Sequence, residues 1–495
     1  MEVSQSDCMI QGSAQNRGTS SNSVQRRALT CGIDQSDAYA TVDILPDDVL
    51  LEIFDFHRID RYFWEWVKLV HVCQRWRQVI FDSPLRLGIH LRCTDKIDVK
   101  KLLGCWPAFP ITVSYSRGKG IDPEDEDNLL AALEHSDRVH HINLHIQEKQ
   151  LAKLGTVIQE PFPMLTQLQL TRKSWPQLVL PHGFLGGSAP RLQELKLEAV
   201  VFPELPKFLL STRDLVTLHL SGISLEEDYI APETMVTYLA SLTRLTSLHF
   251  YQDTFPYDQL DLAPLPQTRT VLPALTSIVF DCVIRYVDDL VARIDCPRLN
   301  SFDLYSCDSA FESIDSQISQ IYKFINRSED PLLTRFDGID VDFGYEGICL
   351  RASHNHPPYI AIFILLDGLN WRLSHVFQFF SQFSPMLSNV RHLSVDFLST
   401  LDRTPTDLDW AQLLVAFSAL QTVDLSGDYK RIAPALEYID KEMAAGLLPA
   451  LDLLYIQDWP MSSVDKFCTT LQDSGRVVTV VKTHEEFYER QESYL

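Results

Sequence analysis

A short apolar pattern that recurs along most of the chain constrains the fold more than any other feature. The pattern apolar-x-x-apolar-x-apolar occurs eleven times, beginning at Val139, Leu165, Leu192, Leu215, Leu245, Leu275, Leu299, Leu333, Val390, Leu420 and Leu451. Successive copies are 23 to 34 residues apart, except for one interval of 57 residues. Spacing of this length is typical of a solenoid, in which each repeat buries its apolar face against its neighbours. We expect the long interval to contain one degenerate repeat at residues 359–366, YIAIFILL.

Each copy of the pattern has the spacing of a short β-strand. Its last two apolar residues are two positions apart, so they lie on the same side of a strand and point into the core. The residues beside them point to the other side. Proline precedes several copies by two residues, as at Pro163, Pro273 and Pro449, where it ends any preceding helix.

Between the strands the apolar period becomes helical. Three such stripes are Val287–Leu290–Val291–Ile294, Phe311–Ile314–Ile318–Ile321–Ile325 and Trp410–Leu413–Leu414–Phe417. Strands joined through helices are expected to pair in parallel, with the helices on one side of the sheet. The strand pattern resembles that of divergent leucine-rich repeats. The predicted fold is therefore an α/β solenoid, a curved array with parallel strands on the concave face and helices on the convex face.

Residues 44–80 precede the repeats and predict two amphipathic helices joined by a loop. Pro46, Asp47 and Asp48 suit the first turn of a helix, because proline fits there and acidic groups favour the positive end of the helix dipole. The spacing of the apolar residues that follow predicts one apolar stripe, at Val49, Leu50, Ile53 and Phe54. A second helix is predicted from the three- and four-residue steps between Trp66, Leu69, Cys73, Trp76 and Ile80.

This segment resembles an F-box. The resemblance lies in Leu45-Pro46, Val49-Leu50, Ile53-Phe54 and Val72-Cys73-x-x-Trp76. Together, the hairpin and the divergent repeats resemble F-box proteins of mushroom-forming fungi. The F-box resemblance implies docking on a Skp-family adaptor and, through it, on a cullin–RING ubiquitin ligase. The adaptor-binding residues that it implies are Leu45, Pro46, Val49, Leu50, Ile53, Phe54, Leu69, Val72, Cys73 and Trp76.

The composition limits the classes of partner. A net charge of −23 argues against binding nucleic acid, which needs clustered Lys and Arg. Ten scattered cysteines without a C-x-x-C pair suit reduced thiols in an intracellular protein, cytoplasmic or nuclear. The longest apolar run, Tyr359 to Leu366, is too short to span a membrane, and we see no secretory signal.

Candidate catalytic and metal-binding residues are better explained by ordinary structure. His140, His141 and His145 lie on a predicted strand with no further ligand, so we expect exposed strand residues and no metal site. The acidic run at residues 122–128 is typical of a helix N-terminus. No nucleophile or phosphate-binding motif is present. We therefore expect no enzyme activity and no cofactor.

The remaining candidate is the polar strip on the open side of the strands. Its predicted target-binding residues are Gln167, Gln169, Glu194, Lys196, Thr217, His219, Ser247, His249, Ser301, Asp303, His392, Ser394, Thr422 and Asp424. A polar strip on a rigid curved scaffold is a common site for binding another protein. Solvated strand faces are the alternative for any single residue.

The sequence thus predicts a disordered tail at residues 1–40, an F-box module at 41–90 and a repeat domain with a C-terminal cap at 91–495. The cap is predicted to contain a strand at Val477–Val481 and a charged helix at residues 485–492. The expected function is that of the substrate-recognition subunit of a Skp–cullin–F-box ubiquitin ligase. The alternative is a repeat scaffold without a ligase, in which the hairpin is an N-terminal cap.

Overall fold

The computed structural model describes residues between Ile44 and Thr483. The longer gaps within this span are 57–67, 116–122, 223–229, 253–263, 307–318, 328–335, 366–386, 398–416, 428–449 and most of 458–478. The chain divides into two compact units, residues 1–57 and 58–495. The predicted tail, the final charged helix and the apolar stripe at Trp410, apart from the buried Phe417, lie outside the described residues.

The first unit contributes one described helix, α1 (Asp47–Phe56). It begins where the sequence predicts, since the N–H of Leu50 donates to the carbonyl oxygen of Pro46 at 3.0 Å. Asp47 and Asp48 occupy its first turn, where negative charge favours the helix.

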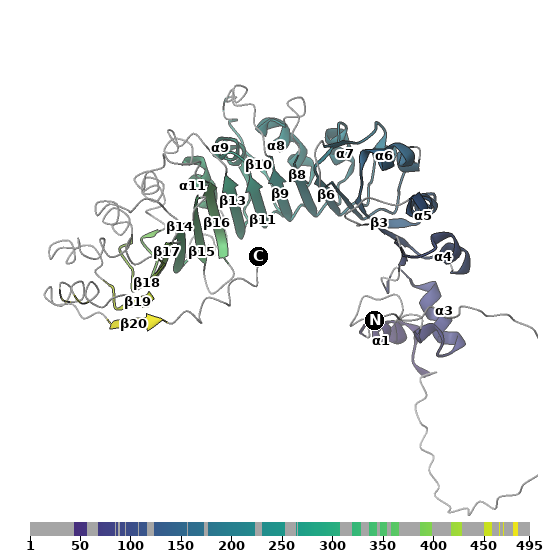
Figure 1. Cartoon of the computed structure of the whole chain (residues 1–495), viewed down its shortest axis with the longest axis horizontal. Helices are drawn as coiled ribbons and strands as arrows, with labels where there is room; N and C mark the ends of the chain where they lie inside the picture. The colour runs from purple at the N-terminus through teal and green to yellow at the C-terminus, as the bar shows by residue number, and fades with distance from the viewer. Residues whose placement is uncertain are drawn as a thin grey trace, which may run out of the picture. The chain divides into compact units, whose positions relative to one another are not determined.

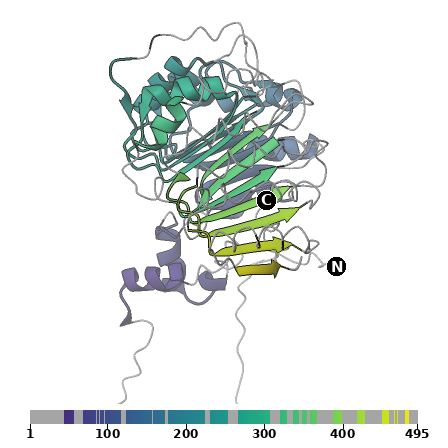
Figure 2. The same cartoon turned by 90° about the vertical axis from the view of Figure 1, so that its left-hand side faces the viewer.

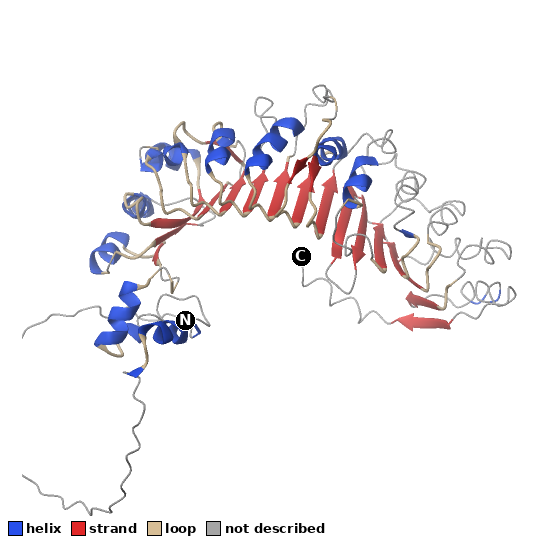
Figure 3. Cartoon of the chain, turned by 180° about the vertical axis from the view of Figure 1, so that it is seen from behind, coloured by secondary structure: helices blue, strands red, loops and turns tan. Residues whose placement is uncertain are grey.

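The second unit contains eight described helices of seven or more residues. They are α3 (Gln74–Asp82), α4 (Val99–Cys105), α5 (Pro123–Leu133), α6 (Glu148–Leu154), α7 (Leu205–Ser211), α8 (Pro232–Ser241), α9 (Ile284–Arg293) and α11 (Ser319–Ile325). Two 3₁₀ helices are η2 (Val157–Gln159) and η3 (Phe184–Gly187). Within this unit, α4 to α9 and α11 follow the outer side of a curved sheet, whereas the strands line its inner side (Figures 1 and 3). The expected placement of helices and strands is confirmed.

One sheet of 16 strands runs through the second unit, and Figure 2 shows its later strands side by side. In spatial order its strands are β1 (Leu91–Cys93), β2 (Ile111–Tyr115), β3 (Val139–His145), β4 (Gln167–Thr171), β6 (Glu194–Glu198), β8 (Thr217–Ser221), β9 (Ser247–Tyr251), β11 (Ser277–Asp281), β13 (Ser301–Ser306), β16 (Pro358–Leu365), β15 (Gly347–Ser353), β14 (Gly338–Phe343), β17 (His392–Phe397), β18 (Thr422–Gly427), β19 (Leu453–Gln457) and β20 (Thr479–Thr483). Two small parallel pairs lie apart from it: β5 (Leu178–Val179) with β7 (Val200–Val201), and β10 (Thr270–Val271) with β12 (Ile294–Asp295).

The apolar pattern sets the register of the parallel strands. In β9 and β11, for example, Leu248 pairs with Ile278 and Phe250 with Phe280, and all four side chains are buried. The residues between them face the other side and are half-exposed. Burying the same two positions in strand after strand builds one continuous core between the sheet and the helices.

Threonine side chains join successive turns before the strands. The hydroxyl of Thr276 donates to the carbonyl oxygen of Thr246 at 3.0 Å. The hydroxyl of Thr246 donates in turn to the carbonyl oxygen of Val216 at 3.2 Å. Thr166 makes the same contact with His140 at 3.1 Å. Each of these carbonyl oxygens also accepts the backbone N–H of the same threonine, so the hydroxyl groups add to the contacts between successive repeats.

A strand, β16, does lie at residues 359–366, where a degenerate repeat was expected. The expected topology is wrong, because β16 does not follow β14 in the sheet as a successive repeat would. After β13, the chain forms β14 three strands away and then returns through β15 and β16, which fill the space between. β15 is antiparallel to both neighbours. The links at 344–346 and 354–357 are too short for a helical crossover, so these strands pair as hairpins.

The phase of the copy expected at Leu333 is also wrong. Leu333 lies outside the described residues, and β14 begins at Gly338. The buried residues that fit the pattern are Phe336, Ile339 and Val341, three positions later. The closing strand, in contrast, is confirmed as β20 at Thr479–Thr483.

Charged side chains connect three successive helices of the array. Arg293 of α9 is buried and donates to Asp289 at 3.0 Å and to Glu233 of α8 at 2.9 Å. Asp288, which precedes Asp289 in α9, accepts the backbone N–H groups of Gln320 and Ile321 at the start of α11. Arg293 therefore connects α9 to the helix before it, and Asp288 connects α9 to the helix after it.

Candidate functional site

The single apolar stripe expected on α1 is divided between two faces of the helix. Leu50, Leu51 and Phe54 are buried, with 0%, 7% and 1% of their surface exposed. Val49 and Ile53 are 38% and 45% exposed. Periodicity groups these residues together, but a helix turns by about 100° per residue, so positions one apart can face core and solvent.

The exposed face of α1 continues to the end of the helix. Val49, Ile53 and Phe56 are four and three residues apart, which places them on one stripe. Phe56 is 86% exposed, and Ile44, just before the helix, is 68% exposed. Sequence reasoning missed Ile44 and Phe56, although the spacing from Ile53 to Phe56 contains the signal. A helix with a buried apolar face and a second, exposed apolar face is suited to docking on another protein.

The second predicted helix is interrupted in the structure. Lys68–Val70 are helical, a turn follows at His71 and Val72, and α3 begins after Cys73. Cys73 has an extended backbone, and its thiol accepts the N–H of Trp76 at 3.4 Å. One continuous helix was therefore the wrong prediction, because Cys73 acts as a cap.

Side chains around this turn differ in exposure. Val72 is 58% exposed, whereas Leu69, Cys73 and Trp76 are half-buried. Leu45 is half-buried as well, and Pro46 is exposed. Of the ten residues that the F-box resemblance implies, Pro46, Val49, Ile53 and Val72 are exposed in the structure.

Residues 42–91 match the model of the F-box-like family. The chain carries an F-box-like domain. The match contains α1, the turn at His71 and α3, and it ends where β1 begins. No curated protein is significantly similar to the chain.

Among solved structures, the chain is similar to TLR13 in its complex with ssRNA13, to a chain of the Rad7 and Elc1 complex in yeast, and to the leucine-rich repeat-containing protein LegL7 from Legionella pneumophila. The identities are 12%, 13% and 10%, and the TM-scores are 0.33, 0.27 and 0.28. These matches cover 80%, 83% and 80% of this chain, and 49%, 88% and 91% of the other chains. The chain thus spans about half the length of the TLR13 chain. The solenoid architecture rests on the strand spacing and register of this chain itself.

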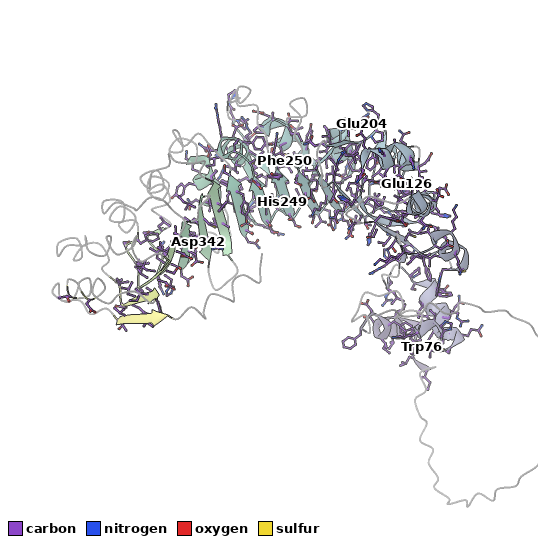
Figure 4. The ribbon with its side chains drawn as sticks, viewed as in Figure 1. Trp76, Glu126, Glu204, His249, Phe250 and Asp342 are labelled. Carbon is purple, nitrogen blue, oxygen red and sulfur yellow. The ribbon has the colours of Figure 1, made fainter. Side chains whose placement is uncertain are left out.

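The polar residues predicted on the open side of the strands all lie there. Each alternates with buried neighbours and is half- or fully exposed: Gln167, Gln169, Glu194, Lys196, Thr217, His219, Ser247, His249, Ser301, Asp303, His392, Ser394, Thr422 and Asp424. Figure 4 shows His249 and Phe250 on opposite sides of β9, with Phe250 toward the helices. Sequence phase alone placed these side chains, but their use in binding stays a prediction.

The first half of this surface carries two neighbouring imidazoles beside a lysine, Lys196, that forms an ion pair with Glu198. His219 and His249 are paired across β8 and β9 with ring centroids 4.0 Å apart, and Lys196 is paired with His219 from β6. Burial, together with repulsion from His249 and Lys196, lowers the pKa of His219 to about 4. Burial and Lys196 also lower the pKa of His249. Both imidazoles are therefore neutral at pH 7.

The second half of the surface is acidic. From β11 to β18 its outward residues include one arginine, Arg351, and six aspartates: Asp281, Asp303, Asp340, Asp342, Asp396 and Asp424. Burial raises the pKa of Asp303 and of Asp342 to about 6, opposed by the N–H of Ala361 and by Arg351 respectively. Arg351 forms an ion pair with Asp342. Sequence reasoning missed Asp281 and Asp396 because it left out the third outward position of each strand. It missed Asp340 and Asp342 because the phase expected from Leu333 was wrong.

The expectation that His140 and His145 are exposed is wrong. His140 lies on the core side of β3 and is 9% exposed, and His145 is 7% exposed beside the hydroxyl of Thr171, 3.2 Å from its Nδ1. His141 stacks on His90, with ring centroids 4.7 Å apart. Among the described residues, no group of three or more His, Cys, Asp or Glu is placed to hold a metal ion.

Two smaller expectations can be compared with the structure. The acidic run at residues 122–128 overlaps the N-terminus of α5, as predicted. Within the described part of the chain, no helix is long and apolar enough to cross a membrane.

Proposed function

We propose that the chain is the substrate-recognition subunit of a Skp–cullin–F-box type ubiquitin ligase. The observation that carries this proposal is the exposed apolar stripe of α1, formed by Val49, Ile53 and Phe56 within a segment that matches the F-box-like family. Large apolar side chains left in water on a short helix are stabilised when a partner covers them. The partner proposed is a Skp-family adaptor.

In this proposal the buried and exposed residues of the F-box-like domain have different roles. Leu50, Phe54 and Ile80 fix the fold, whereas Val49, Ile53 and Val72 contribute contact area. Leu69, Cys73 and Trp76 are half-buried, so each can do both. The adaptor then connects the chain to a cullin–RING enzyme.

The sheet face binds the target protein in this proposal. Its side chains project from strands in register, so they are held in fixed positions relative to one another. Ubiquitin transfer then depends on holding the target near an enzyme bound elsewhere, which raises the effective concentration of the target. The chain itself needs geometry rather than catalytic groups.

Co-expression with a Skp-family adaptor tests the proposal. We expect a one-to-one complex that survives size-exclusion chromatography, with its mass measured by light scattering. A chain that elutes alone while the same adaptor binds a known F-box segment would contradict the proposal. It would favour a repeat scaffold without a ligase.

A further inference from the structure

On the sheet face, an aromatic pair made of the exposed Tyr305 and the half-buried Phe363 lies beside Asp281 and Asp303. Across neighbouring strands the register runs from Asp281 to Tyr305 and then to Phe363. Tyr305 is 41% exposed, and its ring centroid lies 6.0 Å from that of Phe363. Asp303 precedes Tyr305 by two residues on β13, so both side chains leave the same face of that strand.

The carboxylates lie close enough to act on the tyrosine. Burial raises the pKa of the Tyr305 phenol, and Asp303 and Asp281 raise it further by repelling the phenolate. Asp303 accepts a hydrogen bond from the backbone N–H of Ala361. Among the described residues it forms no ion pair, whereas Arg351 is engaged with Asp342.

We propose that Tyr305, Phe363, Asp281 and Asp303 form a subsite that receives an arginine or lysine side chain from the protein bound on the sheet face. The face of an aromatic ring attracts a cation, and flanking carboxylates add charge complementarity. The six aspartates and single arginine from β11 to β18 extend that complementarity to further basic residues of the same segment. This subsite rests on the proposed function, since it concerns the target-binding face.

The chemistry distinguishes this patch from the rest of the face. Around His219 and His249 the imidazoles are neutral at pH 7, and Lys196 is paired with Glu198 at 3.8 Å, so this part of the face has fewer carboxylates without a cationic partner. A bound segment is therefore oriented, with its basic residues over β11 to β14. Guanidinium is favoured over ammonium, because a planar group stacks on a ring while its N–H groups reach carboxylates.

Fluorescence polarisation with the full chain tests the subsite. The probe is a labelled Gly/Ser peptide containing several arginines, and the control probe has glutamine at each of those positions. We expect the arginine peptide to bind at least tenfold more tightly. Equal affinity for the two peptides, or no arginine-dependent binding at millimolar peptide, would overturn the proposal.

Variants separate a local subsite from general attraction to an acidic protein. We expect Tyr305→Ala to weaken arginine-peptide binding about fivefold and Tyr305→Phe to leave it unchanged. Asp303→Asn is expected to weaken it about two- to fivefold. The matched control Asp127→Asn removes the same charge from the exposed surface of α5 and is expected to have no effect. Equal effects of Asp303→Asn and Asp127→Asn, or none from Tyr305→Ala, would refute the subsite.

Adaptor binding is measured on the same protein preparations. The subsite variants lie in the sheet, so we expect them to retain full adaptor binding. Loss of arginine-peptide selectivity with adaptor binding intact would reject the subsite alone. Selectivity in a chain that binds no adaptor would reject the ligase assignment and retain the subsite.

Discussion

Removal of the exposed apolar side chains of α1 is expected to abolish adaptor binding without unfolding the chain. The variant carries Val49→Ala, Ile53→Ala and Phe56→Ala together. These side chains are 38%, 45% and 86% exposed. Substitution of exposed residues usually changes the free energy of unfolding by less than about 0.5 kcal/mol. Val49 and Ile53 are also partly covered in the free chain, so the variant is expected to keep its fold with a somewhat lower melting temperature.

The magnitude follows from the surface that a partner would cover. Full burial of such a side chain contributes about 1.5–3 kcal/mol. After scaling by the exposed fractions and allowing for the methyl group that alanine retains, the three contribute about 2–4 kcal/mol to binding. Because about 1.4 kcal/mol corresponds to a tenfold change, the adaptor Kd is expected to rise roughly 30- to 1,000-fold.

Isothermal titration of the purified adaptor into each variant measures this change. The matched control replaces Val179 and Leu210, which are 49% and 52% exposed but lie on β5 and α7, by alanine. We expect the control to bind like the wild type. Leu50→Ala is a folding control: Leu50 is fully buried, and its loss is expected to destabilise α1 by about 2–5 kcal/mol. An adaptor Kd within twofold of the wild type for the triple variant would refute the reasoning.

Three further predictions concern the sheet and its helices. Burial raises the pKa of Asp288 from 3.8 to about 7. Between pH 3.8 and about pH 7 the folded chain therefore holds a proton on Asp288 that the unfolded chain lacks, so the stability of the fold falls as the pH rises through this range. Asp288→Asn, whose amide oxygen still accepts two N–H groups, is expected to be more stable than wild type at pH 8 by about 1–3 kcal/mol, with little difference at pH 4, in urea denaturation. Gly222 has a φ of +63°, and a Cβ there would lie 3.3 Å from the backbone of Ala199, so Gly222→Ala is expected to lower the melting temperature. Gly104→Ala, within α4, is not expected to lower it, because a Cβ there would meet no atom within 4 Å. Phe280→Ala opens a cavity in the core and is expected to cost about 3–5 kcal/mol in the same denaturation assay, and a loss below 1 kcal/mol would contradict its burial.

The phase of the parallel strands could be predicted from sequence because it depends on a local rule. In the copies at Leu165, Leu215 and Leu275, the paired strand begins two residues after the first apolar residue. Side chains that follow the same rule, such as His219 and Asp303, were therefore placed on the correct face. Alternation of buried and exposed residues along a strand requires no knowledge of its neighbours.

The return of the chain through β15 and β16 could not be predicted in the same way. Ile360 and Ile362 of β16 are as apolar as any repeat residue, but the pattern does not encode strand direction. The F-box-like segment has a similar ambiguity, because periodicity does not show which of two adjacent apolar positions is buried. Leu50 and Ile53 were grouped on one stripe, and only the folded helix separates them.

The central claim is that α1 is the surface covered by the adaptor. Amide hydrogen exchange of the full chain, with and without saturating adaptor, measures this directly. We expect slower exchange across residues 44–56 in the complex and unchanged exchange in β6, β8 and β9. Adaptor bound in a one-to-one complex with no protection of residues 44–56 would contradict the account.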